Sequence, residues 1–225
     1  MKSGVLRRCT LLANARHAST AAPVYVRPNW LEENCGDVPV LPHPQDSEVS
    51  EMLRGGHALQ IASATMLDAK VAGATRWVNT YSVDHLEKIK ELQGIENKAV
   101  KRIEDTVRTQ DYRFRPSLVI AAVELNSMIV GGVLSTLGDN VSTSYVTGMK
   151  MAVSDYYNDQ IREIYAHKPD MVELKELFKV TRDEEQEFVD AHTPDVLDLN
   201  ADSSDPVTTF AKGSLKVLIQ VARTV

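Results

Sequence analysis

The sequence predicts an all-α protein, an antiparallel helix bundle, on three observations. From about residue 46 onward, apolar residues recur at spacings of three, four and seven, which places them on one face of successive helices. These long periodic segments are joined by short connections, as in antiparallel bundles. No strong strand alternation, Gly-rich phosphate loop, CxxC pair or Gly-x-Ser-x-Gly elbow occurs in the 225 residues, so nothing in the chain favours a sheet.

Charge is distributed unevenly along the chain. The overall content, 43% hydrophobic and 25% charged, is that of an ordinary globular protein. No acidic residue precedes Glu32, whereas five basic residues do. Setting those five aside leaves 20 of the 25 basic residues against 31 acidic ones, a net charge near −11. Nucleic acid is therefore not expected as a partner, because phosphate binding needs a basic face.

The first 24 residues have the composition of a mitochondrial transit peptide, with arginine, serine, threonine and alanine and no acid. A secretory signal is the alternative, but no apolar core of adequate length is present. Removal of this segment would take Cys9 with it and leave Cys35 without a partner, which agrees with a reducing compartment. Residues 25–45 contain four of the prolines and are expected to form a linker to a helical domain over 46–225.

The first helix of that domain is expected to start near Asp46 or Ser47, either of which can serve as N-cap. Gly55-Gly56 predicts a kink or break in it. A second helix is expected from about Thr75, and the charged run over 95–110 either extends it or forms a short extra helix. Each of these two helices has an inner face that is mostly apolar but carries polar residues. On the first helix this face consists of Val49, Met52, Leu53, Gln60, Ser63, Leu67 and Val71, and on the second of Val78, Tyr81, Ser82, His85, Ile89 and Leu92.

The most apolar stretch runs from Leu118 to Leu137. It is about long enough to cross a bilayer, but Glu124 lies inside it and a charge in a membrane span is costly. We therefore expect a buried or interfacial helix, with a transmembrane span as the alternative. The spacing of Ser127, Gly131 and Ser135 would let another helix approach closely.

Three more helices follow, over about 141–167, 170–191 and 206–225. In the first, Lys150 shares a stripe with Tyr157, Ile161 and Ile164. In the second, Glu185 shares a stripe with the apolar residues Met171, Leu174, Phe178 and Phe188. A lysine and a glutamate that face a core need partners, because unpaired buried charges are very costly.

Five segments of the chain match motifs of a known family. They are Asp-His-Leu-Glu-Lys-Ile-Lys-Glu-Leu (84–92), Arg-x-Arg-Pro (113–116), Tyr-Asn-Asp-Gln-Ile-Arg (157–162, with Tyr157, Gln160 and Arg162), Arg-Asp-Glu-Glu-x-Glu (182–187) and Ser-Leu-Lys-Val-Leu-Ile-Gln (214–220). With these segments the chain, from about His57 onward, resembles the demethoxyubiquinone hydroxylase family, ferritin-like di-iron proteins of ubiquinone biosynthesis. The resemblance implies a ferritin-like antiparallel bundle with an additional apolar, membrane-associated helix, and an insert near 95–110.

The resemblance also implies where the metal ligands of such a bundle, two Glu and two Glu-x-x-His pairs, would fall. The six former metal-ligand positions are Gln60, Ser82, His85, Lys150, Glu185 and Phe188. Only His85 and Glu185 keep a residue of the expected kind. Two irons bring four positive charges, whereas these positions supply one carboxylate and an ammonium. We therefore expect no metal cofactor, and an ion pair between Lys150 and Glu185, hydrogen-bonded to Gln60, Ser82 or His85, in place of the metal cluster.

Two functions follow from the resemblance. The first is a relative without di-iron catalysis and without confident catalytic residues, which binds ubiquinone or its precursors or serves as a structural subunit beside ubiquinone-biosynthesis proteins or in another mitochondrial assembly. The second is an active hydroxylase with two irons and ligands found elsewhere. The nearby candidates for such ligands are His57, Asp155, Glu184, Glu187 and His192. In either case we expect a peripheral protein on the matrix side of the mitochondrial inner membrane.

Overall fold

The computed structural model describes residues 47–76, 82–109, 116–192 and 205–224. This part of the chain is helical, which confirms the predicted all-α class. In chain order its helices are α2 (Ser47–Arg76), α3 (Val83–Thr109), α4 (Ile120–Leu134), α5 (Asp139–His167), α6 (Val172–His192) and α7 (Pro206–Thr224). The predicted transit peptide, the predicted linker and residues 113–115 of the Arg-x-Arg-Pro turn lie outside the described residues.

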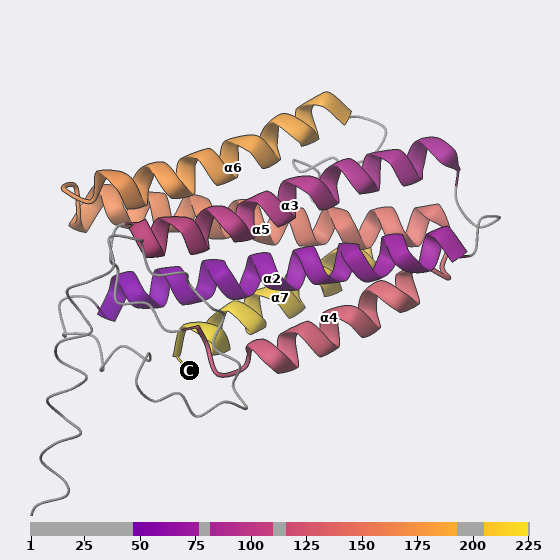
Figure 1. Cartoon of the computed structure of the whole chain (residues 1–225), viewed down its shortest axis with the longest axis horizontal. Helices are drawn as coiled ribbons and strands as arrows, with labels where there is room; N and C mark the ends of the chain where they lie inside the picture. The colour runs from indigo at the N-terminus through magenta and orange to yellow at the C-terminus, as the bar shows by residue number, and fades with distance from the viewer. Residues whose placement is uncertain (1–46, 77–81, 110–115, 193–204, 225) are drawn as a thin grey trace, which may run out of the picture.

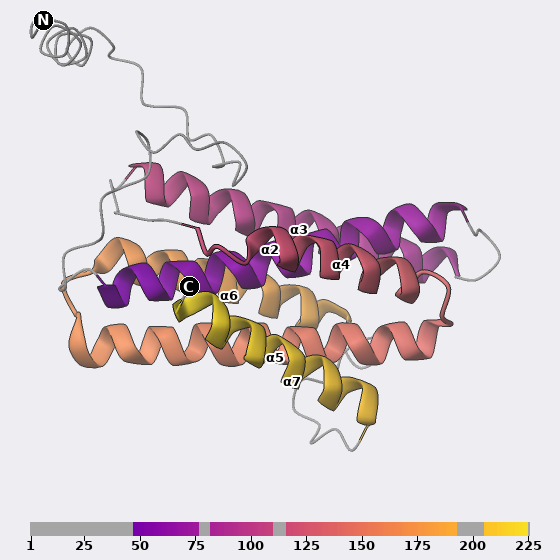
Figure 2. The ribbon, with the colours of Figure 1, turned by 90° about the horizontal axis from the view of Figure 1, so that it is seen from below.

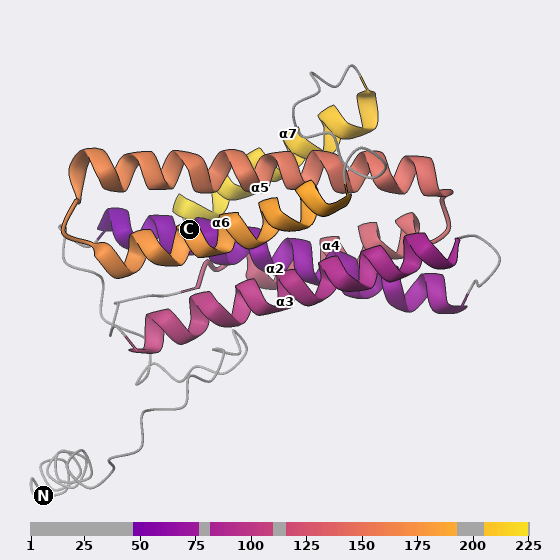
Figure 3. The ribbon, with the colours of Figure 1, turned by 90° about the horizontal axis from the view of Figure 1, so that it is seen from above.

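Four long helices, α2, α3, α5 and α6, form the bundle in which α2 and α3 run antiparallel, as do α5 and α6 (Figure 1). α2 is the central element, since it contacts α3, α4, α5 and α7. α4 packs along α2, and α7 crosses α5 and α2 obliquely on the same side of the bundle (Figures 2 and 3). The centre of the molecule is therefore enclosed by four helices, with two more helices covering one side.

Two glycines in α2 were expected to interrupt this helix, but α2 is continuous from Ser47 to Arg76. The predicted break is absent, and both glycines instead serve packing. A Cβ at Gly55 would lie 2.6 Å from the Tyr156 hydroxyl oxygen, and one at Gly56 would lie 3.5 Å from the Tyr156 ring. Tertiary contact with α5 thus offsets the low helix propensity of glycine.

The small residues of α4 bring it close to α2. A Cβ at Gly131 would lie 2.1 Å from the backbone oxygen of Met66, and one at Gly73 would lie 2.1 Å from the Ser135 hydroxyl oxygen. The Ser127, Gly131 and Ser135 spacing therefore serves a contact within the chain. α4 is 15 residues long, and no helix in the described ranges is long and apolar enough to cross a membrane.

The opposite side of α4 is apolar and exposed. Leu125, Met128 and Ile129 are each more than half exposed, as are Phe210 and Val217 of α7.

The N-terminus of α7 is capped by Asp205, whose carboxylate accepts hydrogen bonds from the Thr208 amide (2.9 Å) and hydroxyl (2.7 Å). Pro206 follows directly at the first helical position, where its missing N–H costs nothing.

Candidate functional site: a buried charge cluster at the centre of the bundle

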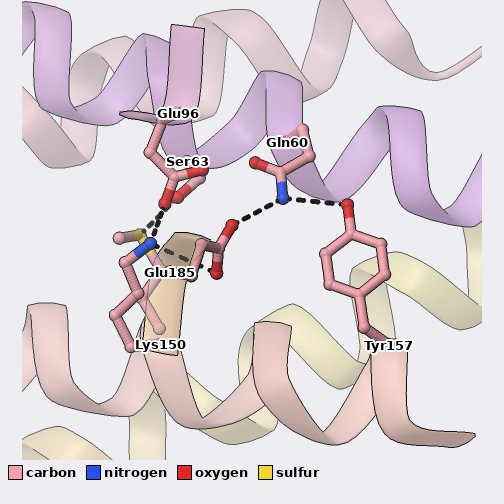
Figure 4. A network of polar contacts seen from close by, with 7 residues as sticks. Gln60, Ser63, Glu96, Lys150, Tyr157 and Glu185 are labelled. Atoms are coloured by element: carbon pink, nitrogen blue, oxygen red, sulfur yellow. Dashed lines mark hydrogen bonds and ion pairs between the residues drawn. The ribbon is translucent and has the colours of Figure 1, made fainter. Parts of the chain in front are cut away.

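Lys150 is the centre of the candidate site. It lies on α5, and its side chain is 1% exposed because it points among α2, α3 and α6 (Figure 4). Its ammonium donates to Glu96 Oε1 of α3 and lies 3.3 Å from Glu185 Oε2 of α6. The two carboxylates raise the pKa of Lys150 against the opposing effect of burial. The lysine is therefore held as a cation inside the bundle.

Gln60 and Tyr157 extend this cluster along α2 and α5. The Gln60 amide donates to Glu185 Oε1 and lies within hydrogen-bond distance of the Tyr157 hydroxyl oxygen, both at 2.9 Å. Neither side chain is exposed to solvent. Tyr157 also packs edge-on against Tyr156 and tilted against Phe178, which fixes its ring. Gln60, Glu96, Lys150, Tyr157 and Glu185 are called the central cluster below.

The structure thus brings together three of the six positions at which the resemblance would place metal ligands, Gln60, Lys150 and Glu185. The Lys150–Glu185 contact and the Gln60 hydrogen bond have the form that the sequence led us to expect. Phe188 lies in the apolar core at 4% exposure, and an aromatic ring of this kind offers no ligand atom. No described group of three or more His, Cys, Asp or Glu residues is placed to hold a metal ion.

Ser82 and His85, the two alternatives to Gln60 as hydrogen-bond partners of the ion pair, are not part of this cluster. They lie at the start of α3, where the His85 backbone N–H donates to the Ser82 hydroxyl. His85 Nε2 lies 3.3 Å from the ammonium of Lys70. Glu96 is eleven residues further along α3, or about 16 Å along the helix axis. The physical reason is that α3 continues unbroken to Thr109, so its middle turns, and not its first, lie beside Lys150.

Glu96, which is fully buried, is not among the residues that the sequence predicts at the centre of the bundle. The sequence predicts only a charged, inserted helical segment over 95–110. The missed signal is that Glu96 continues the stripe of Ile89 and Leu92 at helical spacing and leads to Val100 and Ile103. A glutamate in that register faces the core.

A second buried cation lies near the start of α3. Burial lowers the pKa of Lys70 to about 8, an effect that Asp139 opposes. Burial and the charge of Lys70 together lower the pKa of His85. His85 is thus engaged with a cation, an arrangement unlike that of a metal ligand.

The ligand candidates of the active-enzyme alternative are mostly engaged elsewhere. His57 Nε2 lies 3.4 Å from Glu104, Asp155 pairs with Lys212 and Lys216, and Glu184 pairs with Arg102. Glu187 is exposed. The His192 side chain lies outside the described residues. Of the other residues that carry the resemblance, Gln160 is buried, whereas Arg162 is exposed and pairs with Asp159.

The donor set does not fit two irons. Both carboxylates of the central cluster, Glu96 and Glu185, face the ammonium of Lys150, which would repel a metal ion at the same place. Three residues after Glu96 stands Ala99, and three after Glu185 stands Phe188. Neither helix therefore completes a Glu-x-x-His pair at this level.

A cavity of about 50 Å³ lies beside the central cluster, among α2, α4, α5 and α7. Met66, Val130, Met149 and Leu218 supply apolar lining, and Tyr145 and Ser214 supply hydroxyl groups. The Ser63 hydroxyl donates a hydrogen bond to Met149 Sδ at 3.1 Å. Met149 directly precedes Lys150 in the sequence. Asn126 and Ser127 of α4 and Leu215 of α7 also line the cavity.

Fold and site together define a ferritin-like helix bundle whose centre holds a lysine–carboxylate cluster. A family model described as "Ubiquinone biosynthesis protein COQ7" matches residues 47–222. The chain belongs to this family, which confirms the resemblance seen in the sequence and places the protein in ubiquinone biosynthesis. None of the curated proteins compared with the chain matches it.

One prediction concerns the pH dependence of stability. Burial raises the pKa of Glu185 to about 7; Glu96 also raises it, while Lys150 and Gln60 act in the opposite direction. The folded state thus favours the protonated form of Glu185. The stability that this protonation contributes is fully present below pH 4.5, the ordinary pKa of a glutamate, and is lost as the pH rises through about 7.

We therefore expect the free energy of unfolding of the wild type to fall between about pH 5.5 and pH 8.5, relative to Glu185→Gln, by more than about 1 kcal/mol. Urea denaturation of both proteins across this range measures the difference, in which the contributions of other groups cancel. A constant difference between the two proteins would contradict this assignment.

Proposed function

We propose that this chain acts in mitochondrial ubiquinone biosynthesis without di-iron catalysis, as a subunit that binds a quinone or a related lipid or supports other proteins of the pathway. The observation that carries this proposal is the Lys150 ammonium between Glu96 and Glu185. A cation tethered to the chain takes the place where metal ions would need free carboxylates. The chain keeps the bundle of its family and replaces the groups that would ligate iron.

A ligand-binding role is supported by the cavity among α2, α4, α5 and α7. Its lining of apolar side chains with a few hydroxyl groups suits a small amphipathic molecule, but about 50 Å³ is much less than the roughly 300–1,000 Å³ of typical ligand sites, so a quinone can enter only if the helices around the cavity move apart. The exposed apolar side chains of α4 and α7 offer a path along which a hydrocarbon tail can lie, and favour contact with a membrane surface. We place the protein at the matrix face of the inner membrane on the composition of its first 24 residues together with this surface.

The alternative is an active demethoxyubiquinone hydroxylase with two irons. It is supported by family membership alone. It requires the Lys150 side chain to leave the central cluster and further ligands to be recruited, several of them from residues that now pair with other groups.

Elemental analysis of the purified full-length protein separates the two functions. We expect less than about 0.1 iron per chain under reducing, iron-replete expression. Near-stoichiometric iron, with two ions per chain at full loading, would establish the alternative and end the proposal of a protein without di-iron chemistry.

The ligand-binding role is tested by extraction of the same preparation for quinones, with Ser214→Leu as a variant that narrows the cavity. Ser214 is exposed, so that the variant is expected to fold. We expect co-purified quinone to fall severalfold in Ser214→Leu and to stay unchanged in Gln220→Leu, which changes an exposed residue of the same helix outside the cavity lining. If the protein is folded, free of iron and free of quinone, the ligand-binding role is excluded and the role as a structural subunit remains.

A further inference from the structure

We propose that the centre of the bundle is a cation-binding site built of oxygen atoms, and that the chain fills this site with its own Lys150 ammonium. The inference deepens the proposed function and rests on it in one respect, namely that the native protein holds no iron at this place. It adds that the remaining carboxylates still form a cation site. That site would take a divalent metal ion once the lysine is removed.

The central cluster has more buried acceptors than donors. Glu96 Oε1 accepts from Lys150, and the two oxygens of Glu185 contact Gln60 and Lys150. Glu96 Oε2 and Gln60 Oε1 are buried and have no hydrogen-bond partner among the described residues. Buried acceptors of this kind are rare in folded proteins, because each costs free energy. One oxygen of the Glu96 carboxylate and the Gln60 amide oxygen thus lack partners beside the Glu185 carboxylate, which indicates a site that suits a cation.

Charge leads to the same inference. Two carboxylates face one ammonium, and no other cationic group of the described residues is recorded in contact with Glu96 or Glu185. Without Lys150 at least one of the two carboxylates must take up a proton, because two like charges in a water-poor core are strongly unfavourable. A divalent ion balances both charges at once. Carboxylate and amide oxygens are ligands that Mn²⁺ and Mg²⁺ prefer.

Space is available for such an ion only if the lysine is shortened. The Lys150 side chain is among the largest fully buried side chains of the described residues. Truncation to alanine removes the ammonium and its stem, which leaves room for an ion with water. Substitution by methionine removes the charge but leaves the stem volume largely filled. The two substitutions therefore separate loss of charge from the opening of the site.

The test is thermal unfolding of the full-length wild type, Lys150→Ala and Lys150→Met in chelator and in Mn²⁺. We expect Mn²⁺ at one hundred times its Kd to raise the Tm of Lys150→Ala by roughly 5–10 °C. The wild type and Lys150→Met are expected to shift by less than about 1 °C. About one Mn²⁺ per chain should remain with Lys150→Ala after desalting and give a protein-bound signal in electron paramagnetic resonance.

Second substitutions serve as controls. Adding Glu96→Gln to Lys150→Ala should abolish the response to Mn²⁺. Adding Glu87→Gln, which changes an exposed glutamate of the same helix, should leave the response intact. If Lys150→Ala is recovered unfolded, refolding in Mn²⁺ is expected to restore its helical circular dichroism and refolding in chelator is not.

An equal Tm shift in the wild type, or the absence of both stabilisation and refolding of Lys150→Ala by Mn²⁺, would overturn the inference. These outcomes are distinct from a failure of the proposed function, which would appear as iron in the wild-type protein.

Discussion

Lys150→Met is expected to lower the free energy of unfolding by about 3–5 kcal/mol at neutral pH, because it leaves two buried carboxylates without a cation. Glu96 and Glu185 are 0% and 7% exposed in their side chains, so water cannot take over the role of the ammonium. Loss of a methylene stem contributes little, since methionine has a similar shape. Urea denaturation followed by circular dichroism measures the change.

Lys98→Met is the matched control, because it replaces an exposed lysine of α3 and should change stability by less than about 0.5 kcal/mol. The triple variant Lys150→Met, Glu96→Gln and Glu185→Gln should recover most of the loss. Replacing a complete buried ion cluster by neutral groups is often close to neutral, whereas breaking one is not. If Lys150→Met were as stable as the wild type, the two carboxylates would not need the ammonium of Lys150, which would contradict the prediction.

Gly131→Ala is expected to cost about 3 kcal/mol, because its Cβ would lie 2.1 Å from the Met66 backbone oxygen. The obstacle is backbone, which cannot rotate away as a flexible side chain can. The added Cβ would also lie 2.9 Å from the Cβ of Ala69, so α4 must move off α2. The same urea titration measures this loss.

The neighbouring Gly132→Ala is the control within one helix. No atom lies within 4 Å of the Cβ that it would add, so the higher helix propensity of alanine should raise stability by up to about 1 kcal/mol. Gly148 and Gly213 form a second pair for which the same contrast is expected. A Cβ at Gly148 would lie 2.3 Å from the Thr208 backbone oxygen, whereas one at Gly213 would have no atom within 4 Å. Equal effects at Gly131 and Gly132 would rule out close packing as the reason for the glycine.

The burial of Lys150 and Glu185 was largely predictable from the spacing of the apolar residues on their helices. Lys150 and Glu185 share stripes with Tyr157 and Phe178, and those stripes are buried in the structure. Helical periodicity decides which face of a helix is apolar, and a charge on that face must find a partner inside. The partner of Lys150 was only half predicted, because Glu96 makes the closer contact.

By itself, the sequence determined the all-α class, the family and the presence of a lysine and a glutamate on inner helix faces. Only the tertiary structure decided which turn of α3 lies beside Lys150. His85 and Glu96 are eleven residues apart, about three turns, so both lie on nearly the same face of α3. Sliding a helix by whole turns preserves its apolar stripe, and a stripe therefore cannot specify the level at which helices meet. Packing of α3 against α2 and α6 fixes that level and places Glu96, in preference to Ser82 and His85, opposite the central lysine.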